Sequence, residues 1–128
     1  MRLWHEALLP RLPDAQLLGQ HRECCALRGL AWARRHRTVD YVFTHPPSWL
    51  AAYHLRVMAE MKSRGFRPDT KWLDPAYRGL RAEPWDETDM AAVEAVQQRA
   101  VVYPEHNQVY LRQCLDNLGG KGIRLDLP

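Results

Sequence analysis

The 128-residue sequence has few cysteines and no long apolar run. Its three cysteines, Cys24, Cys25 and Cys114, are an odd number with two adjacent members, which is unlike the framework of a secreted disulfide protein. No segment approaches the roughly 20 consecutive apolar residues that span a bilayer. Arg2 and His5 interrupt the start of the chain before a signal-type run can develop. We therefore expect reduced thiols and a cytoplasmic protein without a membrane partner.

The sequence also lacks the spacings that identify a structural zinc site. Cys24 and Cys25 could be joined by two of the six histidines, but the Cys-x2-Cys and His-x3-His patterns are missing. We predict neither a metal nor another cofactor.

A third absence concerns β-strands, because no segment alternates apolar and polar residues with a period of two. The length is typical of one domain, and 46% hydrophobic residues are enough for a packed core. We predict an all-α fold over residues 1–128, a compact single-domain bundle of three to four helices with long ordered loops.

Four segments have the apolar spacing and the boundary residues of helices. They run from Pro13-Asp14 to Gly29, from Pro46-Pro47 to Gly65, from Asp86 to Arg99, and from Pro104 to Gly119-Gly120. Between them, residues 30–45 predict a short helical turn followed by an ordered loop, and residues 66–84 predict a packed loop rich in proline. Residues 120–128 are expected to form a short tail.

Charge is divided unevenly along the chain. Residues 1–82 carry fourteen Lys and Arg against seven Asp and Glu, whereas residues 83–128 carry four against eight. Twelve of the fourteen cations are arginine, whose planar guanidinium binds phosphate through two parallel hydrogen bonds. An anionic polymer is a plausible partner, although a solvated face with local carboxylate partners would have the same composition.

One face of the first predicted helix carries a polar stripe. Gln16, Gln20 and Glu23 lie at i, i+4 and i+7, and the small residues Gly19 and Ala26 flank them. Small residues would let another backbone, or the sugar and phosphate of a ligand, approach the glutamate. The stripe makes Glu23 a candidate catalytic carboxylate, and a surface ion pair is the alternative.

Several short motifs occur in a recognisable order. They are Met1-Arg2-Leu3, His21-Arg22-Glu23, His36-x-Thr38, Ala59-Glu60 with Arg64-Gly65-Phe66, and Tyr77-Arg78-Gly79. In this order the chain resembles the pyrimidine-dimer DNA glycosylase (phage endonuclease V) family, and within it a shorter bacterial branch. The resemblance is strongest over residues 1–80 and weaker over 104–118.

The resemblance implies a compact all-α DNA repair enzyme that removes a damaged base from double-stranded DNA and then cleaves the strand as an abasic-site lyase. The nucleophile in this family is an N-terminal α-amine, which forms a Schiff base with the deoxyribose. Because the large Arg2 side chain favours retention of the initiator residue, Met1 would supply that amine here. By the family pattern, Glu23 is the essential carboxylate.

The resemblance also implies a DNA-binding surface, for which we select Arg2, Arg22, Arg28, Arg34, Arg35, Arg37, Gln16, Gln20 and His21. Two positions depart from the family: a histidine seven residues before the glutamate is Gln16 here, and an arginine three residues after it is Ala26. Arg28 is a candidate to compensate. The aromatic tail of the phage protein is absent, which leaves the lesion open. The family mechanism involves kinked DNA and a base flipped out opposite the lesion.

Other interpretations remain at this point. A non-catalytic helical DNA-binding protein would need the arginines but neither a free N-terminus nor Glu23, and a protein-interaction domain would need none of them. An enzyme could also be an abasic-site lyase or a glycosylase for another lesion. We expect a monomer, associated with the nucleoid when it acts on DNA. Residues 83–103 have no clear counterpart in the family pattern.

Overall fold

The structure is a computed structural model that describes residues 1–86 and 90–125. Within these ranges it has helices of two kinds and no strand, so the predicted all-α fold is confirmed. The α-helices are α1 (Asp14–Arg28), α2 (Pro47–Ser63), α3 (Met90–Gln97) and α4 (Gln108–Gly120). Short 3-10 helices are η1 (Glu6–Arg11), η2 (Asp40–Thr44) and η3 (Thr70–Leu73).

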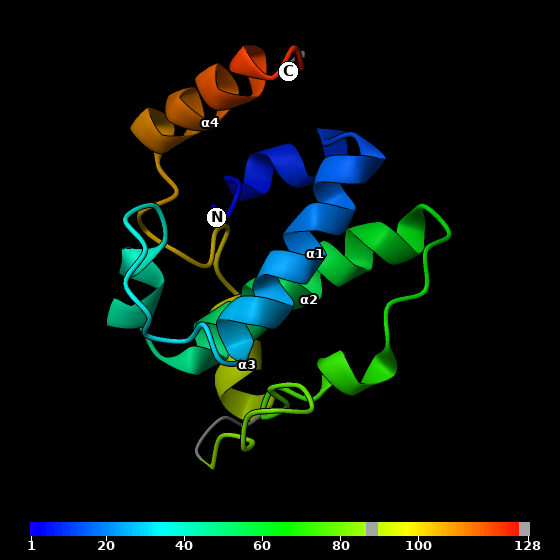
Figure 1. Ribbon diagram of the computed structural model, residues 1–128, viewed down its shortest axis with the longest axis vertical. Coiled ribbons are helices and arrows are strands. Elements are labelled where there is room, and N and C mark those ends of the chain that lie inside the picture. Colours follow the sequence, from blue (N-terminus) through cyan, green and yellow to red (C-terminus); the bar gives the residue numbers. More distant parts are fainter. Residues whose placement is uncertain (87–89, 126–128) are drawn as a thin grey trace.

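The two longest helices form the centre of the molecule. Helix α1 crosses α2 and packs on it, and α3 packs on another part of α2 (Figure 1). Helix α4 lies beyond the N-terminal segment and contacts it through Tyr110, which donates a hydrogen bond to the carbonyl oxygen of Leu3. The N-terminus therefore lies among helices from both halves of the chain.

The boundaries of α1 and α2 agree with the prediction. Helix α1 begins at Asp14, where a negative charge favours the helix N-terminus, and ends before Gly29. Helix α2 begins with Pro47 in its first turn and ends at Ser63, just before the glycine at position 65. Proline at the start and glycine after the end are strong local signals, which explains the agreement.

The prediction for the fourth helix is wrong at its start. Helix α4 begins at Gln108 rather than at Pro104, because the Asn107 side chain accepts a hydrogen bond from the backbone N–H of Tyr110 at 2.9 Å and caps the helix there. Before it, His106 is buried and its N–H donates to the carbonyl of Tyr103 at 3.0 Å. This buried turn takes the place of the predicted first turn.

Other segments differ in smaller ways. The turn expected early in 30–45 is present over residues 29–33, where Trp32 N donates to Gly29 O at 3.2 Å. The 3-10 helices η1, η2 and η3 were not predicted. Helix α3 is described from Met90, and residues 87–89 of the predicted third helix lie outside the described residues. The predicted tail is partly packed: Ile123 N donates to Leu118 O at 2.9 Å and Ile123 contacts the core. Residues 126–128 lie outside the described part.

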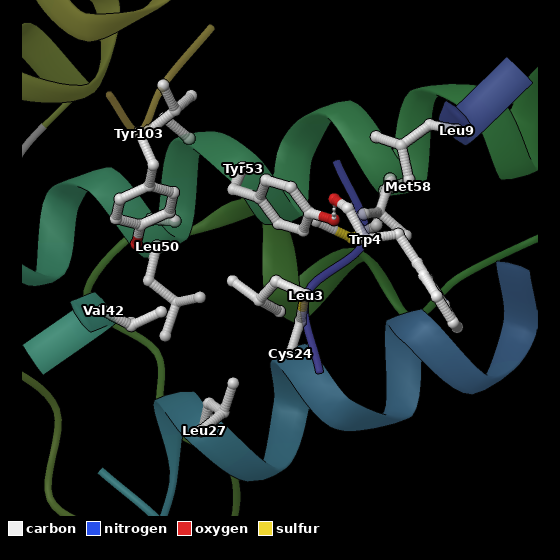
Figure 2. Packing of buried hydrophobic residues seen from close by; sticks show 14 of the residues in the cluster. Leu3, Trp4, Leu9, Cys24, Leu27, Val42, Leu50, Tyr53, Met58 and Tyr103 are labelled. Atoms are coloured by element: carbon white, nitrogen blue, oxygen red, sulfur yellow. Dashed lines mark hydrogen bonds between the residues drawn. The ribbon is translucent and has the colours of Figure 1, made fainter. Parts of the chain in front are cut away.

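The first residues of the chain form part of the core. Leu3 is fully buried and Trp4 nearly so, and Figure 2 shows Leu3 between Cys24 of α1 and Tyr53 of α2, with Trp4 near Met58. Burying a leucine side chain contributes roughly 1.5–3 kcal/mol, so this packing holds the segment in place. Among the described residues, no helix combines the length and the apolar character that crossing a membrane requires.

Candidate active site

Side chains of α1 hold the backbone of the N-terminal segment. Glu23 accepts a hydrogen bond from the backbone N–H of Arg2 at 3.2 Å through Oε2. Gln20 uses both ends of its amide: Nε2 donates to the carbonyl oxygen of Arg2 at 2.9 Å, and Oε1 accepts from the N–H of Trp4 at 2.6 Å. Helix α1 therefore fixes residues 2–4 in an extended path along its polar stripe.

Three further hydroxyl groups complete the arrangement. Thr38 donates to the carbonyl oxygen of Met1, Tyr110 donates to that of Leu3, and Tyr53 donates to that of Trp4 at 2.6 Å. We call the five side chains that hold this backbone the N-terminal clamp: Gln20, Glu23, Thr38, Tyr53 and Tyr110. They come from α1, α2, α4 and the loop before η2, so the position of the N-terminus depends on the whole fold.

The clamp leaves the terminal residue itself accessible. Met1 is 41% exposed, whereas Leu3 is fully buried. The α-amine of Met1 is thus one residue away from the peptide group that is hydrogen-bonded to Glu23. The exposed terminal residue is therefore joined directly to a peptide group that Glu23 holds by a hydrogen bond.

Glu23 is half-buried and has an ordered environment. Its Oε2 accepts from Arg2 N and from Gln20 Nε2, both at 3.2 Å. Because two donors bind the same oxygen, the other oxygen can face a substrate. The predicted approach of a second backbone to Glu23 is present, but it does not depend on Gly19: a Cβ there would meet only Arg22 Nη2 at an ordinary 3.7 Å.

Four exposed arginines lie on α1 and in the loop before η2. Arg22 follows the polar stripe on α1, and Arg34, Arg35 and Arg37 lie exposed in the loop before η2. We call these four residues the arginine rim. The same loop includes Thr38, whose hydroxyl bonds the carbonyl of Met1, so the loop is tied to the N-terminus.

Two further residues predicted to bind DNA lie beside the clamp. Arg2 is half-buried with its guanidinium 5.7 Å from the centre of the Tyr110 ring, and Gln16 is half-buried on the polar stripe one turn before Gln20. Both residues are partly exposed. Their roles remain predictions.

The prediction that Arg28 binds DNA is corrected, because its side chain is fully buried. Its guanidinium donates to three backbone carbonyl oxygens in η3 and the segment after it, namely those of Trp72 at 2.9 Å, Asp74 at 2.7 Å and Tyr77 at 2.9 Å. Burial lowers the pKa of Arg28 to about 10, so it is still charged at neutral pH. It positions the loop after η3 and is not available to bind a phosphate.

The prediction for Gln20 is corrected for the same reason. Gln20 is 1% exposed and both ends of its amide are used within the N-terminal clamp, so it has a positioning role. His21 is half-buried, with Nδ1 2.8 Å from Nε2 of His54 and Nε2 3.8 Å from the sulfur of Cys25. Its contact with DNA stays a prediction.

The trio of His21, Cys25 and His54 brings potential metal ligands within 4.8 Å of one another. A guanidinium only donates, so His54 Nδ1 accepts from Arg28 Nη1 at 3.0 Å, and the proton of the neutral ring is on Nε2. Burial and the Arg28 charge lower the pKa of His54, which keeps the ring neutral. The nitrogen that faces the trio therefore has no free lone pair for a metal.

The third member of the trio is a thiol. Burial raises the pKa of Cys25 to about 11, so the thiol is protonated at neutral pH in the metal-free protein. Arg28 also places a positive charge beside the trio. The arrangement is a hydrogen-bonded connection between α1, α2 and the loop after η3.

Three clamp residues were not selected from the sequence. Tyr53 and Tyr110 occur in helical patterns that indicate only that they face inward, and Thr38 belongs to a short motif without an assigned role. A general signal was present, because a buried tyrosine usually needs a partner for its hydroxyl group. The partners are backbone carbonyls of residues 1–4, which no local pattern relates to positions 53 or 110.

Comparison with known proteins gives one match. A family model described as pyrimidine dimer DNA glycosylase matches residues 1–74, which is more than half of the chain. The matched region includes Met1, Glu23, Thr38 and the arginine rim, whereas Tyr110 and α4 lie outside it. Neither the curated proteins nor the solved structures that were searched contain a match.

Proposed function

Because the chain belongs to the pyrimidine dimer DNA glycosylase family, we propose that it excises a damaged base from double-stranded DNA and then cleaves the strand at the abasic site. The observation that carries this proposal is the hydrogen bond between Glu23 and the backbone of Arg2, next to the accessible Met1. A DNA-binding protein without catalytic activity would need neither this bond nor an exposed terminal residue.

The first chemical step is attack by the α-amine of Met1 on C1′ of the damaged nucleotide. An α-amine has a reference pKa of about 7.7–8.0, against about 10.4 for lysine, so such amines are partly neutral and nucleophilic at pH 7. The new N–C1′ bond forms as the glycosidic bond breaks and the base leaves with the bonding electrons. The Glu23 carboxylate stabilises the positive charge that develops on the sugar.

The second step opens the sugar and breaks the strand. The amine nitrogen loses a proton, the C1′–O4′ bond breaks as O4′ takes up a proton and becomes a hydroxyl group, and a protonated imine links Met1 to C1′. Removal of a proton from C2′, with Glu23 as the base, then expels the 3′ phosphate by cleavage of the C3′–O bond. Water finally hydrolyses the imine and restores the free amine.

The clamp supports this chemistry by positioning. Gln20 contacts the backbone of Arg2 and Trp4 and also the Glu23 carboxylate, so it holds the N-terminal segment and the carboxylate in a fixed relative position. A side chain that acts through such contacts is a positioning residue. Orientation of two reacting groups can be worth several orders of magnitude in rate, and small displacements are costly.

DNA binding is assigned to the arginine rim together with Arg2 and Gln16. Guanidinium groups at Arg22, Arg34, Arg35 and Arg37 would neutralise phosphates around the lesion, and affinity should fall steeply with salt. We propose that residues 1–128 act as one domain and as a monomer on damaged duplex. The substrate class is the pyrimidine dimer named by the family, with other lesions as outcomes to be tested.

Replacement of Glu23 by Gln tests the proposal. The amide can still accept the hydrogen bond from Arg2 N, so the N-terminal segment stays in place, but the charge and the base are lost. We expect binding to a duplex with a cyclobutane dimer to be retained while strand cleavage falls by about a thousandfold or more. Cleavage by E23Q at the wild-type rate, or no cleavage by the wild type on dimer or abasic duplex, would overturn the proposal.

A further inference from the structure

The loop after η3 presents a single leucine to solvent from a rigid base. Leu80 is 92% exposed, the highest value among the exposed large hydrophobic residues of the described chain. At the base of the loop, the N–H of Trp85 donates to the carbonyl of Ala76 at 3.0 Å. Buried Arg28 fixes the segment leading into it, as described above. We call residues 76–85 the leucine loop.

The leucine loop is seated on the carboxyl end of α1. Arg78 donates from Nε to the carbonyl of Arg28 at 2.8 Å and from Nη2 to that of Gly29 at 3.0 Å, and its guanidinium lies 4.6 Å from the centre of the Trp85 ring. A Cβ at Gly29 would be only 3.0 Å from the carbonyl oxygen of Arg78, so this close approach requires glycine. Gly79 adopts φ +90° immediately before Leu80.

Leu80 lies at the edge of a shallow surface groove of about 600 Å³. Its described lining includes the apolar residues Ala26, Leu30, Ala31 and Leu80, the cations Arg34, Arg78 and Arg81, and no acidic residue. Leu30 is also more than half exposed. A groove with an apolar floor and a wholly positive rim fits a partner with flat apolar surfaces and negative charges, which is the chemistry of stacked bases and phosphates.

The groove shares two elements with the candidate active site. Ala26 of its lining follows Glu23 by three residues on α1, a rise of about 4.5 Å along the helix. Arg34 belongs both to the groove lining and to the loop that Thr38 ties to Met1. A duplex bound at Met1 could therefore extend along α1 toward the groove.

We propose that Leu80 is an apolar wedge that enters the base stack of the bound duplex and fills the gap left by an extruded nucleotide, while Arg34 and Arg81 bind the adjoining phosphates. The inference rests on the proposed function and adds a specific residue to it. The physical need is clear: an amine cannot reach C1′ of a stacked nucleotide without distortion of the duplex, and unstacking costs a few kcal/mol. Burial of an exposed leucine between bases offsets part of that cost.

The test measures base extrusion directly, in the non-cleaving E23Q background. A duplex carries an abasic site opposite 2-aminopurine, whose fluorescence rises when it leaves the stack. We expect E23Q to raise the fluorescence and the double variant E23Q/L80A to lose most of that rise at saturating protein. Retention of the full rise in the double variant would overturn the inference, and so would a lack of any rise in E23Q.

Cleavage assays separate failure of the wedge from failure of the proposed function. L80A should cleave a duplex substrate at least about tenfold more slowly than wild type, while cleavage of an abasic site in single-stranded DNA stays unchanged because nothing needs to be unstacked. The matched control is V109A, which truncates another exposed apolar residue, 67% exposed on α4. It should behave as wild type in every assay, and equal loss in V109A and L80A would contradict the inference.

Discussion

Arg22 and Arg28 lie on the same helix six residues apart, and their surroundings differ completely. Arg22 is exposed in the arginine rim, whereas Arg28 is fully buried and donates to three backbone carbonyls. The same contrast separates the rim from the N-terminal clamp, whose side chains mostly face inward and bind backbone. The clamp should determine whether chemistry occurs, and the rim should determine how tightly DNA binds.

The sharpest test of this division is a change at the terminal residue alone. Extending the chain by Gly-Ser before Met1 moves the α-amine away from Glu23 without altering any side chain of the clamp or rim. We expect strand cleavage of abasic duplex to fall by about a thousandfold or more, with DNA affinity within a few-fold of the original. The control is the same protein after proteolytic removal of the extension, and equal rates before and after removal would contradict the account.

The paired variants R28M and R22M test the contrast within α1. R28M removes a buried charge together with donors to the carbonyls of Trp72, Asp74 and Tyr77, so we expect it to lower the free energy of unfolding by about 3–5 kcal/mol. R22M, at an exposed position, should change it by no more than about 0.5 kcal/mol but should weaken DNA binding. Chemical denaturation measures both, and similar losses in the two variants would refute the distinction.

The buried His54 should also affect how the free energy of unfolding depends on pH. Burial lowers the pKa of His54 well below its ordinary value of 6.5, so the folded protein keeps the ring neutral while the unfolded chain takes up a proton. Stability should therefore fall as pH drops below about 6.5. H54Q should reduce this slope by up to about 1.4 kcal/mol per pH unit, as measured by denaturation between pH 7 and pH 5. An unchanged slope in H54Q would contradict the assignment.

A single rim residue should have the smallest effect. R35A removes one exposed guanidinium, so affinity for duplex should fall a few-fold and the slope of log K against log salt should decrease by about 0.9. The cleavage rate at saturating protein should stay unchanged, because the clamp is intact. K62A, an exposed lysine at the carboxyl end of α2, is the matched control and should leave both the affinity and the slope unaltered.

The features that the sequence predicts correctly are those that local signals determine. The starts and ends of α1 and α2 follow from proline and glycine at their boundaries, and the polar stripe that carries Glu23 lies on α1 as expected. The catalytic role of Glu23 stays a prediction. The start of α4 was missed because two local signals compete there, Pro104 and Asn107, and only packing of the preceding turn decides between them.

What the sequence could not predict depends on contacts between distant residues. Tyr110 binds a carbonyl 107 positions earlier, and Arg28 binds carbonyls 44–49 positions later. No pattern along the chain distinguishes an arginine that will be buried on such acceptors from one that will face solvent. Arg28 was selected as a candidate to compensate for the family arginine that is Ala26 here, and this choice placed it with the DNA-binding residues.

The central claim is that Met1 is the nucleophile beside Glu23. The most direct measurement is borohydride reduction of tag-free protein with an abasic duplex, followed by mass spectrometric mapping of the adduct. The account predicts one adduct, on the α-amine of Met1, with unmodified methionine at the mature N-terminus. An adduct on Lys62, Lys71 or Lys121, the three lysines of the chain, or no adduct under conditions where the duplex is bound, would contradict it.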